Sequence, residues 1–345
     1  MQQLIAQVEQ GRVPDLLVRA GIRQLLRQRL KEEGGDVETV NERLFVLIER
    51  MNGSPLALST DTANEQHYEL PAPFFEACLG RHLKYSCCHW PDGVSSLDAA
   101  EKAMLELTCQ RAGLADGQDI LELGCGWGSL SLWMAEHYPE SRITAVSNSA
   151  SQRDFIMARC EARGLRNLEI ITCDMNDFAT DKAFDRVVSL EMFEHMRNYR
   201  ELMTRVSAWL RPGGRLFVHI FCHRELAYVF QTEGDDNWMG RHFFTDGLMP
   251  SDNLLLHFQD DLQLTRRWRV NGRHYEKTCN AWLENMDRHR DSLMPVFHRT
   301  YGEDAPAWFN RWRVFHMACA ELFGFRGGNE WYVSHYLFQR PEEQP

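Results

Sequence analysis

The segment Glu122–Gly128 constrains the fold of this chain more strongly than any other part of the sequence. Three glycines alternate with other residues here, directly after the short apolar run Asp119–Leu123. The run predicts a strand, and Leu130–His137 predicts a helix after the glycines. A glycine turn between a strand and a helix brings backbone N–H groups and the positive end of the helix to a bound ligand. Such a turn is typical of sites for dinucleotides and for S-adenosylmethionine.

The spacing within the turn separates these two ligands. Gly124, Gly126 and Gly128 follow a G-x-G-x-G pattern, whereas pyrophosphate binding uses G-x-G-x-x-G. Glu122 stands at the end of the predicted strand, where its carboxylate would attract an amino-acid ammonium and repel a pyrophosphate. The turn therefore predicts S-adenosylmethionine as the cofactor and disfavours a nicotinamide dinucleotide.

Strands and helices alternate from residue 118 onward. Further strands are predicted at Arg142–Ser147, Leu168–Asp174, Asp185–Met192 and Arg215–Phe221, and helices at Ser149–Arg163 and Tyr199–Leu210. Two late strands, Leu262–Val270 and Trp331–Phe338, complete the sheet. This alternation predicts an α/β fold of the class I methyltransferase type, Rossmann-like, with a doubly wound seven-stranded sheet.

The chain divides into four regions in this interpretation. We expect a helical N-terminal cap, a cofactor-binding core, a substrate-binding cap rich in aromatic residues, and a C-terminal completion of the sheet, at 1–80, 81–223, 224–310 and 311–345. Gly34-Gly35 ends a basic helix on which Arg19, Arg23, Arg27 and Lys31 form a stripe. That stripe is either a solvated face or a surface for anionic lipid.

Composition excludes several classes of protein. A formal net charge of -11 argues against nucleic acid as a partner, since phosphates require a broad basic field. The ten cysteines form no CxxC pair, so neither a metal site nor a redox dithiol is expected. No signal pattern and no apolar run of ~18 residues is seen, so we expect a cytoplasmic protein without stable membrane insertion. The sequence is compatible with a homodimer.

The second strand lacks the acid that usually follows it to hold the ribose hydroxyls. Asn148 and Gln152 can form these hydrogen bonds instead, because amides both donate and accept. Asp174 is a candidate for the adenine amino group, or else a cap before Met175. Met175 and Glu191 complete the expected cofactor contacts.

Several separated motifs now indicate a family. The segments Leu83–Trp90, Glu122–Gly128, Ser147–Gln152 and Glu191–His195 resemble the cyclopropane fatty-acid synthase superfamily. Within it, the chain is most similar to coclaurine N-methyltransferases, from Val13-Pro14-Asp15 to the motif at 330–335. The resemblance implies that Tyr85 and Ser86 lie against the methionine end of the cofactor, with Gly124 and Gly126 beneath it.

The resemblance also implies catalytic roles. Glu194 and His195 match the catalytic dyad of the coclaurine-type enzymes, while Cys87, Glu194 and His219 match residues that hold bicarbonate in cyclopropane synthases. Phe221 stands where those synthases carry an aliphatic residue, which argues against bicarbonate. A carboxylate attracts a substrate ammonium, and an imidazole can accept its proton. From position alone, Glu194 could equally be a helix cap and His195 a packed histidine.

Aromatic residues of the cap are either a substrate pocket with cation–π contacts or plain core. The candidates are Trp238, Phe243, Phe244, Tyr275, Trp282, Trp331 and Tyr332. The leading hypothesis is methyl transfer to the nitrogen of a small-molecule amine. The alternative is cyclopropanation or C-methylation of an unsaturated fatty-acyl chain with bicarbonate as base. A protein that binds S-adenosylmethionine without catalysis is disfavoured by the Glu194-His195 pair.

Overall fold

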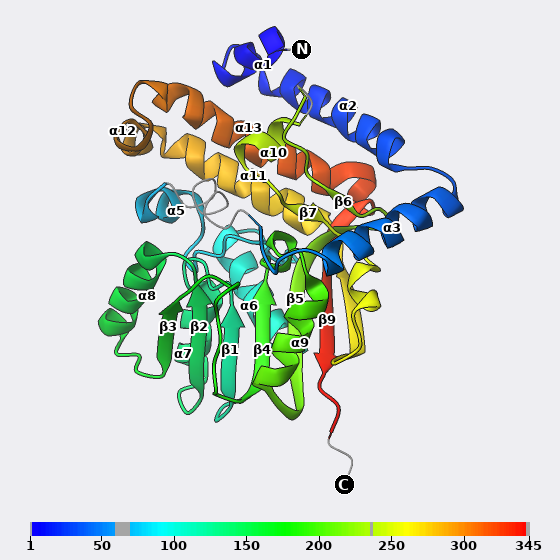
Figure 1. Cartoon of the computed structure of the whole chain (residues 1–345). Helices are drawn as coiled ribbons and strands as arrows, with labels where there is room; N and C mark the ends of the chain where they lie inside the picture. The colour runs from blue at the N-terminus through cyan, green and yellow to red at the C-terminus, as the bar shows by residue number, and fades with distance from the viewer. Residues whose placement is uncertain (1, 59–69, 235–236, 343–345) are drawn as a thin grey trace.

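The computed structural model describes residues 2–58, 70–234 and 237–342. A seven-stranded sheet lies below a layer of helices in the view of Figure 1, with the chain N-terminus in the helical layer. The strands are β1 (Asp119–Leu123), β2 (Arg142–Ser147), β3 (Leu168–Thr172), β4 (Phe184–Leu190), β5 (Leu210–His223), β8 (Gln263–Val270) and β9 (Trp331–Gln339). A small second sheet pairs β6 (Tyr228–Val229) with β7 (Leu248–Met249).

The strand order is β3-β2-β1-β4-β5-β9-β8. The first five of these strands are parallel, and β9 runs antiparallel to both of its neighbours. This confirms the predicted doubly wound, seven-stranded sheet. The order reverses at β1, which has β2 on one side and β4 on the other, and ligands bind beyond the carboxyl ends of the strands at such a point.

Both faces of the sheet are apolar and covered. Adjacent residues of one strand enter separate cores, as Ile120 and Leu121 do, because strand side chains alternate between faces. One core joins the strands to α6 (Leu97–Ala112), α7 (Ser129–His137) and α8 (Ala150–Arg163). The other joins them to α3 (Val37–Asn52) and α9 (Tyr199–Trp209).

The remaining helices form the layer over the carboxyl ends of the strands (Figure 1). They are α1 (Gln2–Glu9), α2 (Asp15–Glu33), α5 (Ala72–Cys78), α10 (Trp238–His242), α11 (Arg273–Arg288), α12 (Arg290–Tyr301) and α13 (Ala305–Gly324). Short 3-10 helices occupy Phe193–His195 (η1), Leu254–His257, Gly302–Asp304 and Phe325–Gly328. Within 1–80 the described residues form α1, α2, α3 and α5, and 59–69 lie outside the described residues. The four-region division stays a prediction; β8 reaches the sheet from within 224–310, and α13 crosses residue 310.

The basic stripe of α2 is divided. Arg19 and Arg23 bind protein, which corrects both alternatives at these two positions, whereas Arg27 and Lys31 are exposed. Arg19 and Arg23 bind Glu321 of α13 at 3.0 and 2.7 Å. Arg19 also donates to Asn280 Oδ1 at 2.7 Å. Gly34 ends α2 as predicted. These partners lie roughly three hundred positions away in sequence, so helical periodicity alone could not identify them. Among the described residues, no helix is long and apolar enough to traverse a bilayer.

Candidate active site

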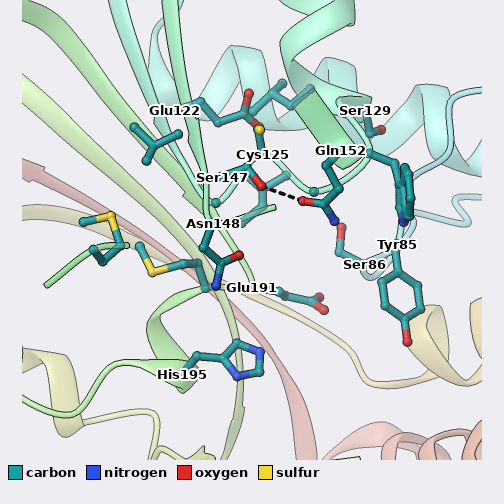
Figure 2. A pocket seen from close by; sticks show the side chains of 18 of the residues that line it. Tyr85, Ser86, Glu122, Cys125, Ser129, Ser147, Asn148, Gln152, Glu191 and His195 are labelled. Atoms are coloured by element: carbon teal, nitrogen blue, oxygen red, sulfur yellow. Dashed lines mark hydrogen bonds between the residues drawn. The ribbon is translucent and has the colours of Figure 1, made fainter. Parts of the chain in front are cut away.

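A pocket opens at the carboxyl ends of β1 and β4, where the strand order reverses (Figure 2). All of the predicted cofactor residues except Asp174 line it: Tyr85, Ser86, Glu122, Gly124, Gly126, Asn148, Gln152, Met175 and Glu191. His195 lines it too, whereas Glu194 does not. The carboxylate of Asp174 accepts the Asn176 N–H at 2.7 Å, and its neighbours Cys173 and Met175 reach the pocket instead. Nine of the ten predicted cofactor residues therefore line the pocket.

The glycine turn wraps tightly around the end of β1. Gly124 and Cys125 both donate their N–H groups to Val146 O, at 3.1 and 3.0 Å. Gly124 has φ of 79°, and a Cβ there would lie 2.8 Å from the Met192 side chain. Gly128 has φ of 81°, and a Cβ there would lie 2.7 Å from Ile156. Only glycine fits these two positions, because each combines a left-handed backbone with a close contact.

Glu122 is a buried carboxylate at the floor of the pocket. It is 2% exposed and accepts a hydrogen bond from the Ser131 hydroxyl. Burial raises the pKa of Glu122 to about 7, against the opposing effect of Ser131. A buried carboxylate of this kind favours a cationic ligand, because a cation restores the charge balance that burial disturbs.

Gln152 presents an unused donor toward the pocket. Its Oε1 accepts the Ser147 hydroxyl at 2.7 Å, as the dashed line in Figure 2 shows. Its Nε2 is buried and has no hydrogen-bond partner within the described part of the chain. A buried amide N–H without a partner is costly, and a ligand hydroxyl would satisfy it. The position suits the ribose role expected of Gln152.

The loop that carries Tyr85 and Ser86 is held by Glu101 of α6. The Glu101 carboxylate accepts the N–H groups of Gly80, His82 and Lys84 at 2.9, 2.7 and 3.1 Å. The Lys84 ammonium turns back to donate to Ser86 Oγ and to Cys87 O. Sequence reasoning missed both Glu101 and Lys84. A glutamate in the middle of an amphipathic helix gives no local signal that it binds a loop about twenty residues earlier.

Glu191 is the centre of the polar cluster in the pocket wall. Its carboxylate accepts the Cys87 N–H at 3.0 Å, faces His219 Nε2 at 3.1 Å and accepts the Tyr275 hydroxyl. Burial raises the pKa of Glu191, while Lys84, the Cys87 N–H and Tyr275 oppose the rise. Glu191 also has a φ of 48°. A non-glycine residue in this region costs about 1 kcal/mol or more and is common at functional sites.

Glu194 and His195 lie just beyond, in η1. Glu194 is 2% exposed, and its Oε2 has no hydrogen-bond partner among the residues described. Burial and the charge of Glu191 raise the pKa of Glu194 well above its ordinary range. Burial lowers the pKa of His195 to about 4, so its imidazole is neutral at physiological pH. Figure 2 shows Glu191 and His195 on the side of the pocket away from Glu122.

Two of the three residues that match a bicarbonate site, Cys87 and His219, are engaged by the protein itself. The Cys87 N–H and His219 Nε2 both face Glu191 Oε1 rather than a cavity. An anion placed on these donors would have to displace the Glu191 carboxylate. The geometry therefore leaves no bicarbonate site on these two residues.

The predicted substrate aromatics fall into two groups. Phe221 and Phe244 lie 5.8 Å apart between ring centres, and Phe244 lies 5.0 Å from His195. Tyr275 contacts Glu191 directly. Trp238 instead donates to Glu9 Oε1 at 2.9 Å, and Trp331 donates to the Tyr228 hydroxyl at 3.2 Å. The first group borders the Glu191 cluster, and the second is bound within the cap.

Comparison with known proteins identifies the family of this chain. Residues 58–330 match the family described as mycolic acid cyclopropane synthetase. The chain belongs to this family. It is 36% identical to the (S)-coclaurine N-methyltransferase of Thalictrum flavum subsp. glaucum, over 98% of this chain and 95% of that protein. It is 29% identical to the cyclopropane-fatty-acyl-phospholipid synthase of Escherichia coli (strain K12), over 78% of this chain and 66% of that protein.

Solved structures agree with this placement. A crystal structure of coclaurine N-methyltransferase bound to N-methylheliamine and SAH is 35% identical, covers 98% of this chain and 99% of that one, and has a TM-score of 0.95. The mycobacterial cyclopropane synthase MmaA2 shares the fold, with a TM-score of 0.69 and 21% identity. The chain is therefore an S-adenosylmethionine-dependent methyltransferase, and the resemblance seen in its sequence is confirmed.

The raised pKa of Glu122 gives this family member a testable pH dependence. We predict that Glu122 binds the ammonium of S-adenosylmethionine, which would favour the charged carboxylate, so affinity should fall about tenfold per pH unit below pH 7. Glu122→Gln should weaken binding and flatten this dependence, since an amide does not titrate. Ser131→Ala should move the midpoint to higher pH, because the carboxylate loses its donor. Calorimetric titration from pH 5.5 to 8.5 measures all three. An unchanged slope in Glu122→Gln would show that another group binds the ammonium.

Proposed function

We propose that this enzyme transfers a methyl group from S-adenosylmethionine to the nitrogen of a small-molecule amine. One observation carries the proposal: the buried Glu191 carboxylate lines the pocket beside the neutral His195 imidazole. An amine substrate is mostly protonated at neutral pH and must lose its proton before it attacks the methyl carbon. A carboxylate and an uncharged imidazole side by side can bind the ammonium and then take up that proton.

Glu191 and Glu194 differ in their tendency to carry a negative charge. Glu191 has three hydrogen-bond contacts and the nearby Lys84 ammonium to favour its charged form. The Glu194 side chain has its own backbone N–H to favour its charged form, but it is buried and sits in the field of Glu191. The first proton of the pair therefore resides on Glu194, while Glu191 faces the amine as a carboxylate. His195 is the proton acceptor. The proposed catalytic site therefore contains Glu191 in addition to the predicted Glu194-His195 dyad.

The acceptor is proposed to be an aliphatic amine that carries an aromatic ring. Phe221, Phe244 and Tyr275 border the Glu191 cluster and offer faces to a planar or cationic group. Relatives that are 34–36% identical are named (S)-coclaurine and pavine N-methyltransferases. These names support an amine nitrogen as the acceptor. Trp238 and Trp331 would act through the packing of the cap instead.

Action on an unsaturated acyl chain is the less favoured function. The Cys87 and His219 donors that the alternative requires for bicarbonate are directed at Glu191. Arg19 and Arg23, two of the four basic residues that suggested a phospholipid surface, bind Glu321. We also place the enzyme in the cytoplasm, consistent with ten cysteines that are all free thiols. Assembly as a homodimer stays a proposal.

A substrate screen tests the function. Purified enzyme is offered tetrahydroisoquinoline amines and, separately, vesicles of unsaturated phospholipid, and S-adenosylhomocysteine release is followed. We expect turnover with amines and none above background with lipid. Turnover with the vesicles alone would overturn the proposal in favour of the acyl-chain reaction.

A further inference from the structure

A hydrogen-bonded chain of four side chains runs from Glu191 through the sheet. His219 on β5 and His335 on β9 are cross-strand partners in the antiparallel register, and both are fully buried. His219 Nε2 lies 3.1 Å from Glu191 Oε1, and His219 Nδ1 lies 2.9 Å from His335 Nε2. Arg111, in the last turn of α6, closes the chain at 2.8 Å from His335 Nδ1.

The chemistry of arginine fixes every proton along this chain. Burial and the nearby Arg266 lower the pKa of Arg111 only to about 10, so its guanidinium stays charged at neutral pH. A guanidinium donates and cannot accept. His335 Nδ1 must therefore accept, so its Nε2 carries the hydrogen and donates to His219 Nδ1. His219 in turn carries its hydrogen on Nε2, aimed at the Glu191 carboxylate.

We infer that Arg111 and His335 are positioning residues for methyl transfer: through His219 they hold an N–H against Glu191 and so fix the direction of its carboxylate. This inference rests on the proposed role of Glu191 as the amine-binding carboxylate. The four groups form an ion pair extended by two neutral imidazoles, with the charges at its ends. Burial lowers the pKa of both histidines well below the ordinary value, so both imidazoles are neutral. The negative charge therefore stays on Glu191 and the positive charge on Arg111.

This series of hydrogen bonds fixes which ring nitrogens carry hydrogen, but it does not carry protons away from the pocket. Proton release along it would have to end on Arg111, which carries no acceptor site. The proton from the amine therefore leaves through the pocket, and the chain acts only on the state of Glu191. The charged and titratable groups that face Glu191 from the surrounding elements are Lys84, Cys87, Cys88, Glu194, His195, His219, Tyr275 and Cys279. Those that face the histidines from outside are Lys84, His89 and Arg111.

The inference predicts a shift in the pH profile rather than a uniform loss. When Arg111 or His335 is replaced, the His219 N–H is no longer held against Glu191. The Glu191 carboxylate is then harder to ionise, so the acid limb of kcat/KM should move to higher pH. We expect a shift of about one pH unit in Arg111→Met and His335→Leu, with near-normal rates above the limb. His335→Gln should restore the wild-type limb, since its amide can accept from Arg111 and donate to His219. Arg111→Lys should restore it in part.

A matched control variant separates the loss of a positive charge from the loss of the hydrogen bond to His335. Arg111 and Arg266 both lie 5.1 Å from the Trp268 ring, but only Arg111 binds His335. Arg266→Met removes a similar charge and a similar ring contact, and it should leave the acid limb in place. The profiles are measured with full-length enzyme at saturating S-adenosylmethionine, next to Glu191→Gln.

The outcomes separate this inference from the proposed function. Wild-type profiles in Arg111→Met and His335→Leu, with Glu191→Gln impaired, overturn the inference alone. A loss that is equal at every pH and is not rescued by His335→Gln also overturns it, because it indicates a purely structural role. An unimpaired Glu191→Gln overturns the role of Glu191 in the proposed function, and the inference with it.

Discussion

Replacing Glu191 with glutamine should lower kcat/KM for the amine acceptor by at least ~10²-fold. The amide keeps the size of the side chain but cannot bind an ammonium by charge or share a proton with Glu194. The acid limb of the pH profile, which we assign to Glu191, should disappear in the variant. In the wild type it should lie above the ordinary range of a glutamate, because burial raises the pKa of Glu191 and activity needs its charged form.

A second buried glutamate provides the control for this change. Glu330 is 5% exposed and lies 3.2 Å from His223, but it lies outside the pocket. Glu330→Gln should alter thermal stability while leaving kcat/KM per folded molecule within a few-fold of the wild type. Steady-state kinetics with circular dichroism of each variant makes the comparison. Equal activity of Glu191→Gln and wild type would remove this carboxylate from the reaction.

Replacing His195 with glutamine should reduce kcat by about 10²-fold while S-adenosylmethionine affinity changes little. His195 lines the pocket, and because burial lowers its pKa to about 4, the imidazole is uncharged over the whole physiological range. For the same reason, His195 should not contribute the acid limb of the wild-type profile. Rapid-quench measurement of a single turnover isolates the methyl-transfer step from product release.

His223 is the corresponding control. It is also a buried histidine, and burial lowers its pKa to about 4 as well. It sits at the end of β5 against Glu330, away from the pocket lining. His223→Gln should therefore keep the wild-type single-turnover rate. If His195→Gln turned over as fast as this control, another group would have to take the proton from the amine.

The sheet was predictable from the sequence almost strand by strand. Glycine turns and apolar runs placed β1 and β2 at their observed bounds, and β3, β4 and β9 within a few residues. This worked because strands buried on both faces of a doubly wound sheet read as continuous apolar runs between turns. The cap was harder to predict, because its helices follow no βα rhythm and pack through aromatic residues far apart in the chain.

The site was predictable in its cofactor half and less so in its acceptor half. The glycine turn follows from local backbone geometry, which spacing reveals, and Gln152 was expected because no acid follows the second strand. The role of Glu191 depends on a left-handed backbone and on contacts from residues 87, 219 and 275, which only the fold brings together. Arg111 gave no signal for the same reason, since its partner lies 224 positions away.

The fate of one methyl group tests the central claim most directly. Enzyme is incubated with S-adenosylmethionine carrying a ¹³C methyl group, together with a secondary tetrahydroisoquinoline and unsaturated phospholipid vesicles in the same tube. We predict that carbon NMR shows the label as an N-methyl group on the amine, and that Glu191→Gln loses this signal while Glu330→Gln keeps it. Label found in a cyclopropane ring or on an acyl-chain carbon would contradict the account.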